Sequence, residues 1–142
     1  MRPLATACAA ALLALAACGG ASDDAQVRET VKRFGDATAK RDYAALCDDV
    51  LSRQLVTRIA SIGLPCEDAL AQGLKGVRRP RLEVRRVRIR DKLALVEVTS
   101  GATGQRGSLD VLRLVHDDDG WRIASLSGAQ PPVPVGEPGR LA

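Results

Sequence analysis

The sequence predicts an α+β fold in which N-terminal helices pack on a curved four-stranded antiparallel sheet. Apolar residues recur at helical spacing as far as Gly76, and at every second position after Pro80. Helices followed by consecutive strands are typical of α+β proteins, in which the helices cover one face of the sheet. The chain of 142 residues has one Phe, one Trp and one Tyr, so we expect a small, aliphatic core.

The first residues have the features of an export signal. Arg2 precedes an uninterrupted small and apolar run over residues 3–17, which is shorter than the ~20 apolar residues that span a bilayer. Residues 15–18, Leu-Ala-Ala-Cys, resemble the lipobox of bacterial lipoproteins, in which the thiol of the Cys is diacylated and the Cys becomes the new N-terminus. The alternative is an ordinary signal peptide that is cut at residues 14–16, Ala-Leu-Ala.

These features divide the chain into four parts. We expect a lipoprotein signal peptide at 1–17, a lipidated tether at 18–24, an α+β domain at 25–128 and a disordered Pro/Gly-rich tail at 129–142. The sequence has no second hydrophobic span, so lipid on Cys18 would hold the domain on the extracytoplasmic face of the cell membrane.

We expect four helical segments before Pro80. The pattern Asp23-x-x-Gln26 resembles a capping box that begins the first helix, which we expect to end near Lys40. The other three are expected at residues 41–47, 50–62 and 67–74. The helix expected at 50–62 has an apolar stripe, which we expect to be buried. The stripe consists of Leu51, Leu55, Ile59 and Ile62.

Four strands are expected after Pro80, at residues 82–89, 93–99, 109–116 and 121–126. The alternation of apolar residues changes phase at Arg85-Arg86, where we expect a β-bulge. Turns are expected at residues 91–92 and 117–120, and a Gly-rich connection at 100–107.

Three segments carry a resemblance to a known superfamily: VKRF…KRDYAALC at 31–47, KLALVEV at 92–98 and LRLVHDDDGWRI at 112–123. In this order they resemble the nuclear transport factor 2-like (SnoaL-like) superfamily, a cystatin-like cone in which a bent sheet wraps a long first helix. The resemblance covers most of the mature chain and implies that any ligand or catalytic group would lie inside the cone.

Two cysteines remain once Cys18 is assigned to lipid and Cys8 to the signal peptide. Cys47 and Cys66 are then an even pair in an oxidising compartment, so we expect a disulfide between them. Small bacterial lipoproteins of the resembled type often have cysteines in the corresponding helical segments. Two free, buried thiols are the alternative.

No catalytic set stands out in the sequence. The superfamily resemblance directs attention to Asp42, Tyr43, Asp110 and His116, but these residues have no triad spacing and form no acid pair. The Asp run at 117–119 after His116 lacks the alternate spacing of a calcium loop and predicts a solvated turn. We therefore expect no catalytic residues, no cofactor and no metal.

The first predicted strand is strongly basic. Arg85, Arg86, Arg88 and Arg90 are the candidates for contact with an anionic surface such as lipid headgroups. The alternative is a solvated edge strand, whose charge prevents pairing with another sheet. Nucleic acid is not expected as a partner, because the export signal and the scarcity of aromatic residues both disfavour it.

These observations predict a lipid-anchored, non-enzymatic binding domain. It would bind either a small apolar ligand in the cone or an envelope protein on the sheet. The alternative function is a small isomerase or hydrolase of the same fold, which would have a polar pocket.

Overall fold

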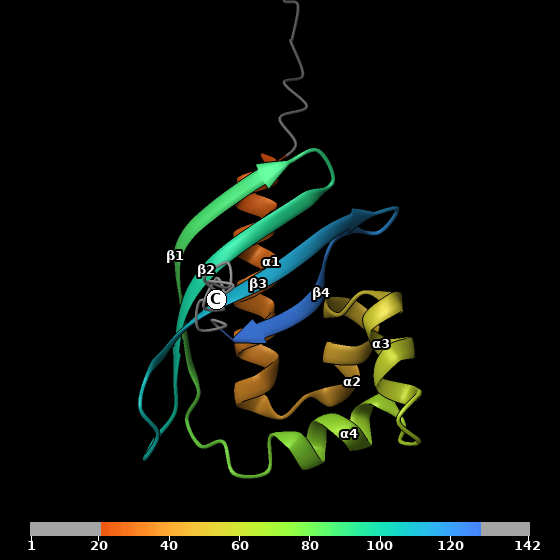
Figure 1. The fold of residues 1–142 in the computed structure, drawn as a ribbon, viewed down its shortest axis with the longest axis vertical. Coiled ribbons are helices and arrows are strands. Elements are labelled where there is room, and N and C mark those ends of the chain that lie inside the picture. The colour runs from red at the N-terminus through yellow and green to blue at the C-terminus, as the bar shows by residue number, and fades with distance from the viewer. Residues whose placement is uncertain (1–20, 129–142) are drawn as a thin grey trace, which may run out of the picture.

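The structure, a computed structural model, describes residues 21–128 (Figure 1). Cys18 and the predicted signal peptide and tail therefore lie outside the described residues. The helices are α1 (Asp23–Lys40), α2 (Tyr43–Ala45), the π-helical turn η1 (Leu46–Val50), α3 (Arg53–Ala60) and α4 (Cys66–Gly73). No helix within the described range is both long enough and apolar enough to cross a membrane.

The four strands form one antiparallel meander. They are β1 (Arg81–Arg90), β2 (Leu93–Gly101), β3 (Ser108–Asp117) and β4 (Gly120–Gly128), and their order in the sheet is β1-β2-β3-β4. The register shifts between Val84 and Arg86, so the predicted bulge in β1 is confirmed. A second shift lies in β3–β4 at Arg113/Leu114.

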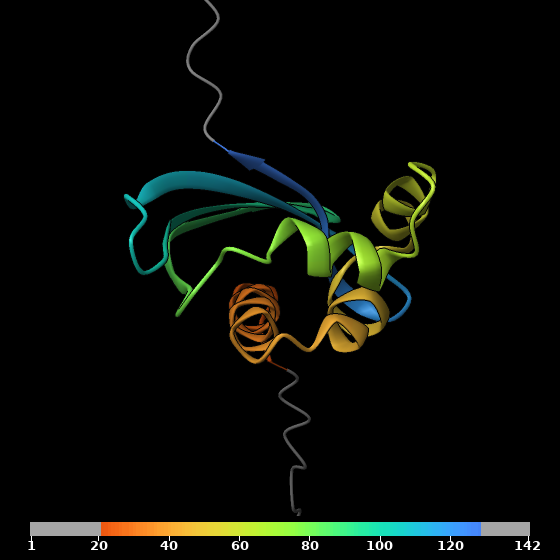
Figure 2. The ribbon, with the colours of Figure 1, turned by 90° about the horizontal axis from the view of Figure 1, so that it is seen from below.

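The α1, α2 and α4 helices lie on one side of the curved sheet, α3 lies beside its β4 edge, and no helix within residues 21–128 covers the other side (Figure 2). The α1 helix packs against β1 and β4. The core between the layers is mainly aliphatic, with Trp121 and Cys66 also buried in it. Its largest fully buried side chains are Leu46, Leu114, Ile123, Val27, Val31, Val50, Val96 and Val98. The predicted fold class, helices on a curved four-stranded antiparallel sheet, is confirmed.

The start of α1 differs by one residue from the prediction. Ser22, rather than Asp23, caps the helix, and its hydroxyl accepts a hydrogen bond from the backbone N–H of Ala25. The helix begins at Asp23, so the last two residues assigned to the tether belong to the helix. Arg41 ends the helix in the left-handed region, with φ of 57°, and its N–H bonds to the carbonyl of Thr38.

The predicted third helix is shorter than expected, and its stripe is only partly buried. Leu51 has an extended backbone and forms an isolated bridge with Ile123 of β4, so the chain cannot be helical there. Ser52 then caps α3 by accepting a hydrogen bond from the N–H of Leu55. Ile62 lies beyond the end of α3 and is 73% exposed, so the expectation that it is buried was wrong.

Candidate functional site

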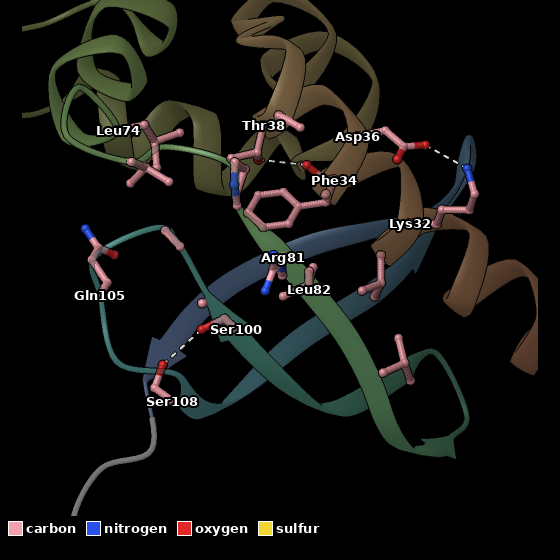
Figure 3. A pocket seen from close by; sticks show the side chains of 18 of the residues that line it. Lys32, Phe34, Asp36, Thr38, Leu74, Arg81, Leu82, Ser100, Gln105 and Ser108 are labelled. Carbon is pink, nitrogen blue, oxygen red and sulfur yellow. Dashed lines mark hydrogen bonds and ion pairs between the residues drawn. The ribbon is translucent and has the colours of Figure 1, made fainter.

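A cavity of about 510 Å³ lies between α1 and the first half of β1 (Figure 3). The segment that joins α4 to β1 and the β2–β3 hairpin complete its wall. These two pieces are joined to each other, because the N–H of Thr103 donates to the carbonyl of Arg78 over 2.8 Å. The cavity therefore lies at one side of the cone, bounded by segments far apart in the sequence.

The interior of the cavity is apolar. The helix contributes one face of α1 and the strand contributes its inward-facing positions, because side chains alternate across a strand. The larger apolar lining residues are Val31, Phe34, Leu74, Val77, Leu82 and Val84. Figure 3 shows Phe34, Leu74 and Leu82 around the hollow.

Gly35 lies where α1 contacts β1, and it lines the cavity. A Cβ at this position would lie 3.6 Å from Cβ of Leu82, an ordinary van der Waals contact. Because glycine leaves this point without a side chain, space remains for the cavity between Phe34 and Leu82.

Charged side chains surround this interior. Four cations and one carboxylate line the cavity: Arg28, Lys32, Arg81, Arg106 and Asp36. Two of the cations have acidic partners on α1, since Arg28 pairs with Asp24 at 2.6 Å and Lys32 with Asp36 at 2.7 Å.

The Lys32–Asp36 pair changes the titration of both groups. The hydrogen bond from Lys32, followed by its charge, lowers the pKa of Asp36 below the ordinary value of 3.8. The same hydrogen bond and the charge of Asp36 raise the pKa of Lys32 above 10.5. Both groups are solvent-exposed, so the pair is a screened surface interaction.

A small polar cluster lies at the β2–β3 side of the cavity. Ser100 and Ser108, which pair across the hairpin and line the cavity, are 2.9 Å apart at their hydroxyls (Figure 3). Both hydroxyls donate to the same carboxylate oxygen of Asp110, the Ser108 bond being 2.7 Å long. The carboxylate is thus held by two hydroxyl donors.

The other residues considered for catalysis do not join Asp110. Asp42 caps α2 by accepting from the N–H of Ala45, and Tyr43 packs at the edge of the core. His116 lies six residues from Asp110 along β3, about 20 Å at strand spacing. The ring of His116 packs edge-on against the ring of Trp121, with 5.1 Å between the ring centroids. The structure therefore does not bring the four residues together.

The Asp run after His116 forms a turn. The side chain of Asp117 accepts from the N–H of Asp119, and Gly120 continues at a φ of 107°. Within residues 21–128, no group of three or more His, Cys, Asp or Glu side chains is arranged to hold a metal ion.

Cys47 and Cys66 are joined by a disulfide, with their Cα atoms 6.2 Å apart. The bond links η1 to the first residue of α4. Cys47 also borders a second, more polar hollow of about 410 Å³ between α3 and the β3–β4 turn. Arg53 and Asp119 both line this hollow and form an ion pair, with 3.5 Å between the guanidinium nitrogen and the carboxylate oxygen.

The four arginines predicted to contact an anionic surface are all exposed on the edge strand β1 and do not line the main cavity. Arg86, Arg88 and Arg90 point to the uncovered side of the sheet, and Arg85 is the bulged residue. Arg88 pairs with Glu97 of β2 at 3.2 Å.

Sequence reasoning did not identify the cavity residues as a site. Phe34 is one of several apolar residues at helical spacing, and neither Arg81 nor Arg106 stands out in the sequence. Gly35 inside an otherwise regular helix was the one available signal, since glycine lowers helix propensity and often has a packing reason.

The combination of a helix-lined, curved antiparallel sheet and a lateral cavity defines a small α+β cone. Several solved structures are similar to this chain, among them the following three. A protein of unknown function from Shewanella baltica, described as NTF2-like (nuclear transport factor 2-like), is similar with a TM-score of 0.55 at 12% identity, covering 73% of this chain and 90% of that chain. A proposed dehydratase of the NTF2-like family from Streptomyces avermitilis has a TM-score of 0.52 at 16% identity, covering 73% and 93%.

The third is a phospholipid-binding protein from Ralstonia solanacearum in complex with a phospholipid. Its TM-score is 0.50 at 15% identity, and the match covers 77% of this chain and 79% of that chain. No family model matches the sequence, and no curated protein matches it. The chain therefore has the nuclear transport factor 2-like fold, as the sequence resemblance implied.

Proposed function

We propose that this protein is a lipid-anchored, extracytoplasmic binding domain that holds a small apolar ligand in the cavity between α1 and β1. The single observation that carries the proposal is the cavity itself, whose volume of about 510 Å³ lies in the range of small-molecule sites. Eleven of the twenty residues that line it are apolar or glycine, and small-molecule sites usually combine an apolar lining with convergent polar groups.

A binding role is favoured over the enzymatic alternative by the state of the carboxylates near the cavity. Asp36 is paired with Lys32, and Asp110 is held by two serine hydroxyls. An isomerase or hydrolase needs an acid or base that is free to exchange a proton with the substrate.

A neighbour in structure supports the choice of ligand class. The Ralstonia protein is described as phospholipid-binding, so the fold can accommodate an apolar chain. Because the likeness is one of fold alone, the proposal rests on the cavity of this chain and not on that ligand.

The cavity can be tested with a neutral fluorescent probe, N-phenyl-1-naphthylamine. Gly35→Leu would place an isobutyl group in the cavity next to Leu82, and we expect it to weaken probe binding by about tenfold or more. Gly73→Leu is the matched control, because it adds the same group to a helix at a position that faces open space. Circular dichroism establishes that both variants are folded. Equal affinity of Gly35→Leu and the wild type would refute the binding site.

The anchoring part of the proposal has its own test. The lipobox at residues 15–18 predicts that the mature protein begins with a diacylated Cys18 and partitions into detergent. Mass spectrometry of the protein purified from membranes would detect the lipid, and Cys18→Ser would release the protein into the soluble fraction. An unlipidated N-terminus created by cleavage at residues 14–16 would support the ordinary signal peptide instead.

A further inference from the structure

We infer that the ligand is an amphiphile with one apolar chain and an anionic headgroup, a carboxylate or a phosphate, and that Arg81 and Arg106 bind the headgroup. The inference rests on the proposed function and adds the chemistry of the ligand and its orientation. It comes from the way the charges around the cavity are paired.

Two of the four cations that line the cavity have no acidic partner. Within residues 21–128, Arg81 and Arg106 form no ion pair, whereas Arg28 and Lys32 pair with Asp24 and Asp36. The described hydrogen bonds also include none from the side chains of Arg81 and Arg106. Both guanidinium groups are therefore available to a ligand.

The two arginines come from different segments that the fold brings to the same cavity. Arg81 is the first residue of β1, and Arg106 lies in the hairpin between β2 and β3. Both residues line the cavity, and a planar guanidinium group can donate two parallel hydrogen bonds to a carboxylate or phosphate. A point charge such as an ammonium would not give this geometry.

Burial determines the direction in which the ligand enters. Arg81 and Arg106 are exposed, as are Arg28, Lys32 and Asp36 of α1, whereas Val31 is 1% exposed and belongs to the buried part of the lining. Phe34 and Leu82 are half-buried. An apolar chain would thus lie inward along Phe34 and Leu82, while its headgroup stays near water at the arginines.

The remaining charges near the cavity are consistent with an anionic headgroup at this place. The carboxylate of Asp36 is neutralised by Lys32, and that of Asp110 accepts bonds from Ser100 and Ser108. Neither acid is paired with Arg81 or Arg106, so an incoming anion would not have to displace an existing ion pair. A cationic headgroup would meet an excess of positive charge.

The test compares four ligands that share a ten-carbon chain: decanoate, decyl phosphate, decanol and decyltrimethylammonium. Their affinities for the purified protein are measured by displacement of N-phenyl-1-naphthylamine. We expect the affinity for decanoate or decyl phosphate to be at least about ten times that for decanol. Decyltrimethylammonium should bind most weakly of the four. Whichever of the two anions binds more tightly identifies the headgroup of the ligand as a carboxylate or a phosphate. Lengthening the acid from ten to eleven carbons is expected to increase affinity by about fourfold.

The double variant Arg81→Gln/Arg106→Gln separates the headgroup site from the apolar cavity. We expect it to lose about tenfold in affinity for the tighter anion and to retain the affinity for decanol. The matched control is Arg88→Gln/Arg90→Gln, which removes two exposed arginines of the same strand that do not line the cavity. We expect this control to bind every ligand as the wild type does.

Two results would overturn the inference, and they differ in what they say about the proposed function. If decanol binds as tightly as both anions, or if the Arg81/Arg106 variant keeps full affinity for them, the inference fails and the apolar site stands. If neither the naphthylamine probe nor any decyl ligand binds to folded wild-type protein, the proposed function fails as well.

Discussion

The indole Nε1 of Trp121 donates a hydrogen bond to a carboxylate oxygen of Asp23 over 3.2 Å, although the two residues are 98 positions apart. Trp121 is 3% exposed, and Asp23 is the first residue of α1. The bond therefore joins the beginning of the longest helix to the beginning of the last strand. It also satisfies the only polar atom of the buried indole ring.

Removal of this bond should destabilise the protein more than removal of a neighbouring acid. We expect Asp23→Ala to lower the free energy of unfolding by about 1–2 kcal/mol, since it leaves a buried N–H without its partner and removes a favourable charge from the first helical turn. Asp24→Ala is the control, because it removes an acid from the same turn and breaks only the exposed pair with Arg28. Urea denaturation followed by Trp121 fluorescence measures both. Equal losses in the two variants would contradict the role of the indole bond.

Two glycines should respond to alanine in opposite directions. Gly35 lies inside α1, and a Cβ there would make ordinary contact with Leu82, so Gly35→Ala should stabilise the protein by about 1 kcal/mol. Gly63 has a φ of 94°, which alanine adopts poorly, so Gly63→Ala should destabilise it by about 1 kcal/mol. Thermal or urea denaturation gives both values. A destabilised Gly35→Ala would mean that the helix cannot accept a methyl group at this contact.

The disulfide should contribute through the loop that it closes. Cys47 and Cys66 are separated by 19 positions, and the chain-entropy model assigns a loop of this length about 3 kcal/mol. We expect the free energy of unfolding of Cys47→Ala/Cys66→Ala to be lower than that of the wild type by about this amount. In reductant, the wild type should unfold at about the same urea concentration as this variant. If reductant leaves the wild-type midpoint unchanged, the pair contributes nothing under these conditions.

The ion pair at the cavity should be visible in the titration of Asp36. Its pKa is lowered mainly by the hydrogen bond from Lys32, so we expect the carboxylate to titrate below 3.8 in the wild type and close to 3.8 in Lys32→Gln. Because the folded pKa is the lower one, the pair stabilises the fold above the ordinary pKa of Asp36. That contribution is lost as the pH falls through the folded pKa. Carbon-13 NMR of the side-chain carboxyl measures the shift, and Lys40→Gln, which removes a more weakly coupled lysine, is the control.

The arginines of β1 remain candidates for contact with an anionic membrane surface. In a Cys18→Ser background, which removes the lipid attachment, we expect vesicles that contain phosphatidylglycerol to bind the protein more tightly than neutral vesicles. Substitution of Arg85, Arg86, Arg88 and Arg90 by Gln should weaken that binding by about tenfold or more, and added salt should weaken it in the parent protein. Unchanged binding after the four substitutions would favour the solvated edge strand.

The sequence alone was sufficient for the order of the helices and strands, because most of them depend on short-range patterns. The end of α1 at Lys40, the bulge at Arg85-Arg86 and the turn at Asp91-Lys92 all follow from local periodicity and turn chemistry. The prediction of a helix at Leu51 was wrong because the backbone there depends on a long-range contact. Leu51 forms a bridge with Ile123 of β4, 72 positions away, in which the next residue, Ser52, donates its N–H to the carbonyl of Ile123, and no local pattern reveals this partner.

The site depended entirely on tertiary structure. The sequence determined that Arg81 and Arg106 are charged and that Phe34 belongs to an apolar helical face, and it placed the cysteines close enough along the chain to bond. Only the packing of α1 against β1, and of the β2–β3 hairpin against the segment before β1, gathers these side chains around one cavity. A cavity is the space left between elements, so its lining depends on long-range packing and not on the pattern within any one of them.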